Sequence, residues 1–131
     1  MLRNWRINRV TYWAGLGLIL AIYVALNFLS SKQVAVSEGV LMFLCIPRLH
    51  DIGKSGWWVG GVFFLEIAVV VISLSILPLK TALIPLGIFT FIVAGLLVWL
   101  GTIPGQPDAN RFGDPPAPGF GLNATKKTPL P

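Results

Sequence analysis

Long apolar stretches that are almost free of charge alternate with short polar connections along this chain of 131 residues. Three of these stretches, 10–29, 57–77 and 81–101, each contain about 20 residues, the length that crosses a hydrocarbon core of roughly 30 Å as an α-helix. A fourth stretch, 34–47, is shorter and contains Glu38, so its length alone leaves open whether it crosses, re-enters or lies at the interface. The pattern predicts a multi-pass helical membrane protein.

The distribution of basic residues decides how the fourth stretch is threaded. With four spans, eight of the ten basic residues fall on one side and only Lys32 and Lys80 on the other, whereas without a crossing at 34–47 the division is four against six. The positive-inside rule therefore favours an all-α membrane protein with four transmembrane helices and both termini in the cytoplasm. We place these helices at about 10–29, 33–49, 57–77 and 81–101.

Composition excludes several other classes of protein. Hydrophobic residues make up 55% of the chain and charged residues only 11%, which excludes an ordinary soluble domain. The net charge of +5 is spread over short segments, so we do not expect nucleic acid to bind. Cys45 is the only cysteine, and no zinc or nucleotide-binding pattern occurs, so we expect no cofactor.

Residues 1–101 then form the membrane domain, and the Pro- and Gly-rich residues 102–131 form an irregular cytoplasmic tail.

The connection at 48–58, Arg-Leu-His-Asp-Ile-Gly-Lys-Ser-Gly-Trp-Trp, concentrates polar chemistry between the second and third helices. Gly53 allows a tight turn and Ser55 is suited to cap the third helix. Asp51 is suited to pair with a neighbouring cation or to orient His50. One interpretation is a charge-paired hairpin that locks two helices together. The other is a surface whose cations bind lipid phosphates or a partner protein.

Basic and aromatic residues from three segments make up the predicted binding surface on the cytoplasmic side. We also expect the tail to fold back and to set Asp108 or Asp114 against a cation of the 48–58 connection, Arg48 or Lys54. The expected partners are membrane lipids, anionic ones above all, and alternatively a second copy or another membrane protein. The candidate residues are Arg6, Arg9, Arg48, His50, Asp51, Lys54, Trp57, Trp58, Asn110 and Arg111.

Two other functions stay open at this point. Glu38 and Glu66 lie at similar depth on adjacent predicted helices, where a pair of carboxylates sharing a proton would suit a small proton or cation transporter or channel. The alternative is that Glu38 reaches water on the outer side and Glu66 is a protonated hydrogen-bonding group between helices. A membrane-embedded enzyme would use His50 as general base with Asp51 beside it, although no nucleophile accompanies them.

A repeat of small residues gives a further packing signal. Gly17, Ala21 and Ala25 recur every four residues in the first span, and Gly56 and Gly60 form a GxxxG step at the start of the third. Such stripes allow close helix contacts, either within the protein or in a seam between copies.

Three blocks of sequence resemble a family of small bacterial inner-membrane proteins known as domain of unknown function 805. They are the segments 6–13, Arg-Ile-Asn-Arg-Val-Thr-Tyr-Trp, 48–58, and 105–115 with its Asn-Arg-Phe-Gly core at 110–113. The resemblance implies a multi-span helical fold in the bacterial plasma membrane, and it implies no activity. We therefore expect a non-enzymatic membrane module whose chemistry is organised on its cytoplasmic face.

Overall fold

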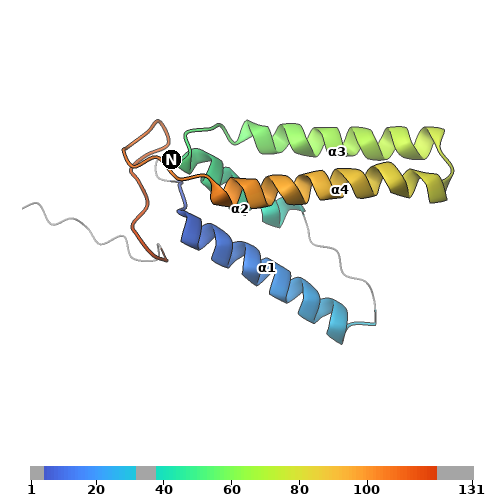
Figure 1. Ribbon diagram of the computed structural model, residues 1–131, viewed down its shortest axis with the longest axis horizontal. Helices are drawn as coiled ribbons and strands as arrows, with labels where there is room; N and C mark the ends of the chain where they lie inside the picture. The colour runs from blue at the N-terminus through green and yellow to red at the C-terminus, as the bar shows by residue number, and fades with distance from the viewer. Residues whose placement is uncertain (1–4, 32–37, 121–131) are drawn as a thin grey trace, which may run out of the picture.

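The computed structural model describes residues 5–31 and 38–120, apart from the side chain of Glu38. Within this part the chain forms four helices and no strand, and the one β-bridge joins Asn110 to Gly113 in the tail. The predicted all-α class is therefore confirmed. The helices are α1 (Arg9–Leu29), α2 (Glu38–Asp51), α3 (Trp57–Ile76) and α4 (Leu79–Thr102) (Figure 1).

Local sequence explains where the helices begin and end. Asn8 caps α1, because its side-chain oxygen accepts a hydrogen bond from the Thr11 amide. Gly53 adopts a φ of +75°, the left-handed conformation that the turn after α2 needs. Ser55 then accepts a hydrogen bond from the Trp57 amide at the start of α3, as the sequence predicted. A short turn at 77–78 reverses the chain into α4.

Three of the four helices are long and apolar enough to cross a membrane: α1, α3 and α4. α2 differs, because 14 residues at 1.5 Å per residue give about 21 Å, less than the roughly 30 Å of a hydrocarbon core. It starts at Glu38, whereas the sequence predicted a span from residue 33; residues 32–37 lie outside the described part. The structure thus gives three candidate spans beside one shorter helix.

The two long helices α3 and α4 form an antiparallel hairpin, while α1 diverges from them toward its own C-terminal end (Figure 1). α2 packs against the other three helices. α1 and α3 begin, and α2 and α4 end, at one end of the bundle (Figure 1), which we call the polar end. The N-terminal segment and the tail after α4 meet there, so segments far apart in sequence are brought together.

Burial is concentrated at the polar end. The buried apolar cluster consists of Tyr12, Cys45, Leu49 and Leu100, whereas only 6% of each candidate span is buried. The remaining faces of these helices are apolar and face outward, as expected for helices whose surroundings are lipid.

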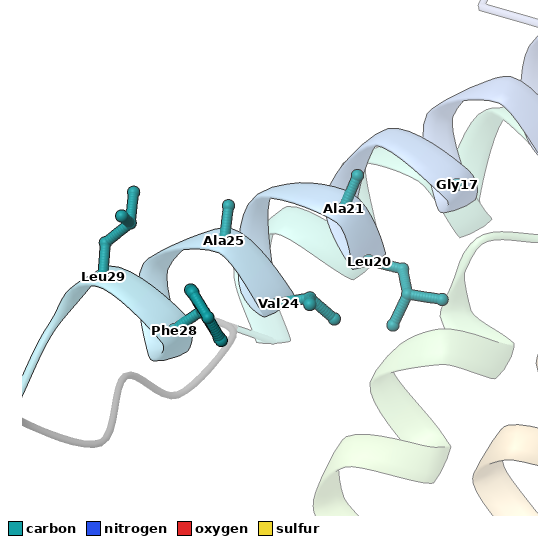
Figure 2. Close-up of a pocket in the computed structure, with 7 residues that line it drawn as sticks. All are labelled: Gly17, Leu20, Ala21, Val24, Ala25, Phe28 and Leu29. Carbon is teal, nitrogen blue, oxygen red and sulfur yellow. The ribbon is translucent and has the colours of Figure 1, made fainter.

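The small-residue stripe of α1 faces outward. Gly17, Ala21 and Ala25 line a shallow apolar hollow formed by α1 alone (Figure 2). A Cβ atom added to Gly17 would meet nothing within 4 Å. The prediction that this stripe packs closely within the protein is therefore wrong. Instead, α1 approaches α2 at Gly15, where an added Cβ would lie 2.6 Å from Leu44 Cδ1. Gly56, directly before α3, does pack closely against Ile46 of α2, whereas a Cβ atom added to Gly60 would contact only Trp57 of its own helix.

Candidate functional site

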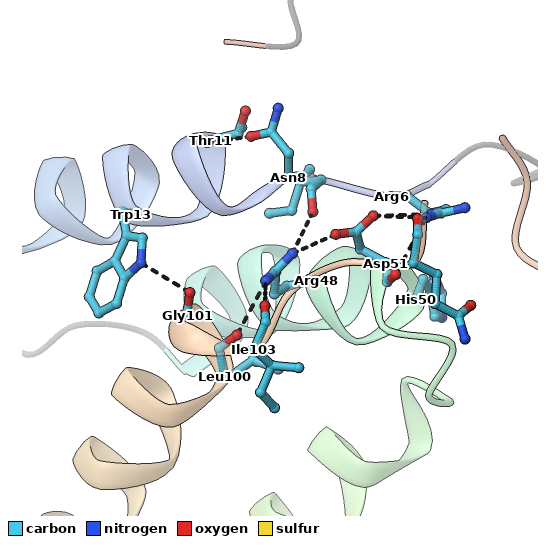
Figure 3. Close-up of polar contacts among 12 residues, drawn as sticks. Arg6, Asn8, Thr11, Trp13, Arg48, His50, Asp51, Leu100, Gly101 and Ile103 are labelled. Carbon is cyan, nitrogen blue, oxygen red and sulfur yellow. Dashed lines mark hydrogen bonds and ion pairs between the residues drawn. The ribbon is translucent and has the colours of Figure 1, made fainter. Parts of the chain in front are cut away.

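Arg48 is fully buried at the end of α2 and joins three parts of the chain. Its Nη1 donates to Asp51 Oδ2 and, at 3.4 Å, to the carbonyl oxygen of Ile7 in the N-terminal segment. Its Nε donates at 3.3 Å to the Leu100 carbonyl, and its Nη2 donates to the Ile103 carbonyl (Figure 3). The last carbonyls of a helix have no partner within it, so Arg48 caps the C-terminal end of α4.

Arg6 approaches the same aspartate from the N-terminal segment. Its Nε and Nη2 lie 3.2 and 3.1 Å from Asp51 Oδ1. Nη2 also donates to the Gln106 carbonyl at 2.7 Å. The tail supplies two further acceptors for Nη1, the carbonyls of Asp108 at 3.0 Å and Gly113 at 2.9 Å. One buried guanidinium therefore holds the tail against the end of α2.

Arg6, Arg48 and Asp51 form what we call the arginine cluster. All three are buried, with relative exposures of 6%, 0% and 2%, and two cations share one carboxylate. The C-terminal ends of α2 and α4 lie here, and their partly negative carbonyl groups offset the surplus positive charge. Within the described residues, no buried side-chain nitrogen or oxygen lacks a hydrogen-bond partner, as a buried charge cluster requires.

Gly105 makes room for the carboxylate. A Cβ atom added to Gly105 would lie 2.0 Å from Asp51 Oδ2, so only glycine allows the chain to pass at this distance. The next residue, Gln106, donates its amide to the Asp51 carbonyl at 2.9 Å. The prediction that the tail folds back is therefore confirmed, but its described contacts with the cluster use backbone carbonyls and an amide. The predicted partners Asp108 and Asp114 have exposed side chains and form no ion pair within the described residues.

His50 points away from the arginine cluster and contacts the tail instead. Its Nδ1 lies 3.2 Å from the Trp5 carbonyl, and its ring stacks on Phe112 with 3.9 Å between centroids. The Asn110 side chain donates to the His50 carbonyl at 2.9 Å. Partial burial lowers the pKa of His50, as does the charge of Arg111, while the hydrogen bond to Trp5 opposes this shift.

The catalytic arrangement considered for His50 and Asp51 is not formed. No hydrogen bond joins these two described side chains, because the Asp51 carboxylate is held by Arg6 and Arg48. A general base oriented by a carboxylate needs that bond. Among the described residues, no group of three His, Cys, Asp or Glu side chains could hold a metal ion.

Five of the ten predicted surface residues are exposed at the polar end: Arg9, Lys54, Trp57, Trp58 and Arg111. Trp57 and Trp58 open α3 and are 86% and 67% exposed. The guanidinium carbon of Arg111 lies 4.6 Å from the centroid of the Phe112 ring, a cation–π distance. The surface interpretation therefore suits these five. It is wrong for Arg6, Arg48 and Asp51, which are buried, and the pairing of Arg48 with Asp51 matches the charge-paired hairpin. His50 and Asn110 are partly buried between the two groups.

The two carboxylates considered for ion transport occupy α2 and α3. Glu66 is partly buried in the middle of α3. Glu38 is the first residue of α2, and its side chain lies outside the described part. A facing carboxylate pair stays a prediction from sequence.

Hydrogen bonds between α1 and α4 are the main feature that the sequence did not indicate. The Tyr12 hydroxyl donates to the Leu97 carbonyl at 2.8 Å, and Trp13 Nε1 donates to the Gly101 carbonyl at 3.1 Å. A Cβ atom added to Gly101 would lie 2.5 Å from Trp13 Cζ2, so the ring lies against a bare helix backbone. The adjacent aromatic pair near an interface was the one available signal.

Comparison with known proteins assigns a family. A family model described as a protein of unknown function, DUF805, matches residues 3–114. No curated protein and no solved structure shows significant similarity. The matched range contains the arginine cluster, all four helices and the tail segment that folds back on them. With most of its length covered by that model, this helical membrane protein belongs to the DUF805 family.

Proposed function

We propose that this protein is a non-enzymatic, multi-pass protein of the bacterial inner membrane that binds anionic phospholipid through its polar end, which faces the cytoplasm. One observation carries the proposal. Among the described residues, five basic and three acidic residues gather at the polar end. The opposite end has one described basic residue, Lys80. Such an excess marks the cytoplasmic side of a bacterial membrane protein.

Chain direction supports a four-crossing arrangement with both termini inside. α1 leaves the polar end and α2 returns to it, and α3 and α4 repeat the same path (Figure 1). A chain that starts and ends at one face crosses an even number of times, so the proposal assigns the second crossing to α2 despite its short length.

The exposed side chains at the polar end suit a lipid headgroup layer. Lys54 and Arg111 carry positive charge into the zone where anionic headgroups lie, and each such charge is worth about 1 kcal/mol of attraction near the surface. Trp57 and Trp58 have the amphipathic rings that anchor helices at this depth. The arginine cluster contributes rigidity beneath this surface, because it fixes the N-terminal segment, α2 and the tail relative to one another.

Lipid retention tests the proposal. The protein is placed in nanodiscs made of equal parts phosphatidylglycerol and phosphatidylcholine, and the lipids retained after mild detergent extraction are quantified. The variant Lys54→Gln/Arg111→Gln should bind phosphatidylglycerol less tightly by about 2 kcal/mol. Lys80→Gln, which removes an exposed cation from the opposite end, should behave like the unaltered protein. Unchanged phosphatidylglycerol retention in the double variant would exclude Lys54 and Arg111 as lipid-binding residues. Retention of phosphatidylglycerol no greater than that of phosphatidylcholine by the unaltered protein would overturn the proposal and favour a protein partner for this surface.

A further inference from the structure

A groove at the polar end lies between the first turns of α1 and the last turn of α4. It is shallow and widely open, and its volume of about 740 Å³ is within the range of small-molecule sites. Most of its lining is apolar, and one cation is among the lining residues. They are Arg9, Val10, Trp13, Ala14, Gly101, Thr102 and Phe120.

Specific contacts hold the walls of this groove in place. The Trp13 ring forms one wall, fixed by its hydrogen bond to the Gly101 carbonyl (Figure 3). The tail forms the other side, because the Asn8 side chain donates to the carbonyls of Ala117 at 2.8 Å and Gly119 at 2.6 Å. These two bonds set Phe120 against the first turn of α1. The groove is therefore built by the fold, and neither Lys54 nor Arg111 lines it.

Arg9 supplies a positive charge that nothing in the described part of the chain neutralises. Its side chain is exposed and takes part in neither ion pair of the described residues. The backbone adds to this charge. Asn8 accepts the amides of Thr11 and Tyr12, whereas those of Arg9 and Val10 have no acceptor among the described residues. Free amides and the positive end of a helix dipole attract an anion.

We infer that this groove binds one anionic phospholipid, with its phosphate on Arg9 and an acyl chain along Val10, Trp13 and Ala14. The charge of Arg9 favours an anion, and the apolar walls favour a ligand that also carries a hydrocarbon chain. In the proposed orientation the groove lies where α1 and α4 emerge from the hydrocarbon layer, so a phospholipid would reach it without leaving the bilayer. This inference rests on the proposed function and adds a defined site to it.

Native mass spectrometry of the full chain tests the site, with phosphatidylglycerol and phosphatidylcholine as probes. We expect one tightly held phosphatidylglycerol. Arg9→Gln should weaken it roughly fivefold, the factor that corresponds to about 1 kcal/mol per charge. Ala14→Trp fills the groove without changing charge and should remove the bound lipid, whereas Ala25→Trp, in the outer hollow of α1 (Figure 2), should keep it.

Two failures are distinguishable. If Arg9→Gln and Ala14→Trp both retain the lipid while Lys54→Gln/Arg111→Gln loses it, the groove is not the site and the proposed function survives. If the unaltered protein holds phosphatidylglycerol no better than phosphatidylcholine, both ideas are wrong.

Discussion

Arg6 and Asp51 lie 45 positions apart in sequence and form a buried ion pair with 3.1 Å between Nη2 and Oδ1. The pair joins the segment before α1 to the last residue of α2. Arg48 completes the contact by linking the same carboxylate to the end of α4. A single carboxylate thus holds the N-terminal segment, the end of α2 and the end of α4 together.

Replacing that carboxylate should destabilise the protein more than any surface change. Asp51→Asn keeps the size of the side chain but leaves two buried guanidinium groups without a counter-charge. We expect the free energy of unfolding to fall by about 3 kcal/mol, as when one partner of a buried ion pair is removed. Denaturant titration in mild detergent measures this. Asp114→Asn makes the same chemical change at an exposed position and should have little effect; equal losses in both variants would contradict a special role for Asp51.

A methyl group at position 105 should detach the tail from the cluster. The added Cβ of Gly105→Ala would overlap Asp51 Oδ2 at 2.0 Å, so the backbone at 105–106 must move away and release the Gln106 contacts. Limited proteolysis should then cut residues 106–113 faster than in the unaltered protein. Gly87→Ala meets nothing within 4 Å and serves as the control. An unchanged cleavage pattern in Gly105→Ala would refute the tight passage.

The hydroxyl of Tyr12 should contribute measurably to the contact between α1 and α4. Tyr12→Phe removes the donor to the Leu97 carbonyl and should lower the free energy of unfolding by about 1 kcal/mol, the usual net value of one hydrogen bond. Tyr23 lies on an exposed face of the same helix, so Tyr23→Phe is the matched control. The two variants should differ in thermal stability, and indistinguishable values would argue against this contact.

Acidification should loosen the contact between α2 and the tail. The folded protein holds the pKa of His50 below its ordinary value of 6.5, so the unfolded chain binds more protons once the pH falls below about 6.5. The contribution of His50 to the free energy of unfolding is fully present above that pH. It declines as the pH falls toward the pKa of His50 in the folded protein. Thermal midpoints at about pH 7.5 and about pH 5.5 measure the effect. Because His50 is the only histidine, His50→Gln should reduce the difference between them, and an unchanged difference would assign it to other groups.

The sequence predicted the long helices well and the role of individual polar residues less well. Runs of about 20 apolar residues fix α1, α3 and α4 because only a helix satisfies the backbone in lipid. The turn at Gly53 and the hydrogen bond that Ser55 accepts at the start of α3 followed from local chemistry in the same way. Periodicity gave no comparable signal for α2, which is shorter than a usual span.

Burial of the arginines could not be read from the sequence, because it depends on contacts between distant segments. The arginines of the N-terminal segment and of the 48–58 connection resemble ordinary topology signals. Only the return of the tail at Gly105 and Gln106 encloses Arg6, and only the end of α4 supplies the carbonyls that Arg48 needs. Arg9, Lys54 and Arg111 are exposed at the polar end, and lipid or partner binding by them stays a prediction.

Quenching of tryptophan fluorescence by brominated lipids tests the binding of anionic lipid most directly, because all five tryptophans lie toward the polar end. The protein is reconstituted in phosphatidylcholine bilayers that contain a small fraction of either brominated phosphatidylglycerol or brominated phosphatidylcholine. We predict stronger quenching by the brominated phosphatidylglycerol, and loss of this excess when Arg9, Lys54 and Arg111 are all replaced by Gln. Equal quenching of the unaltered protein by the two brominated lipids would contradict the account.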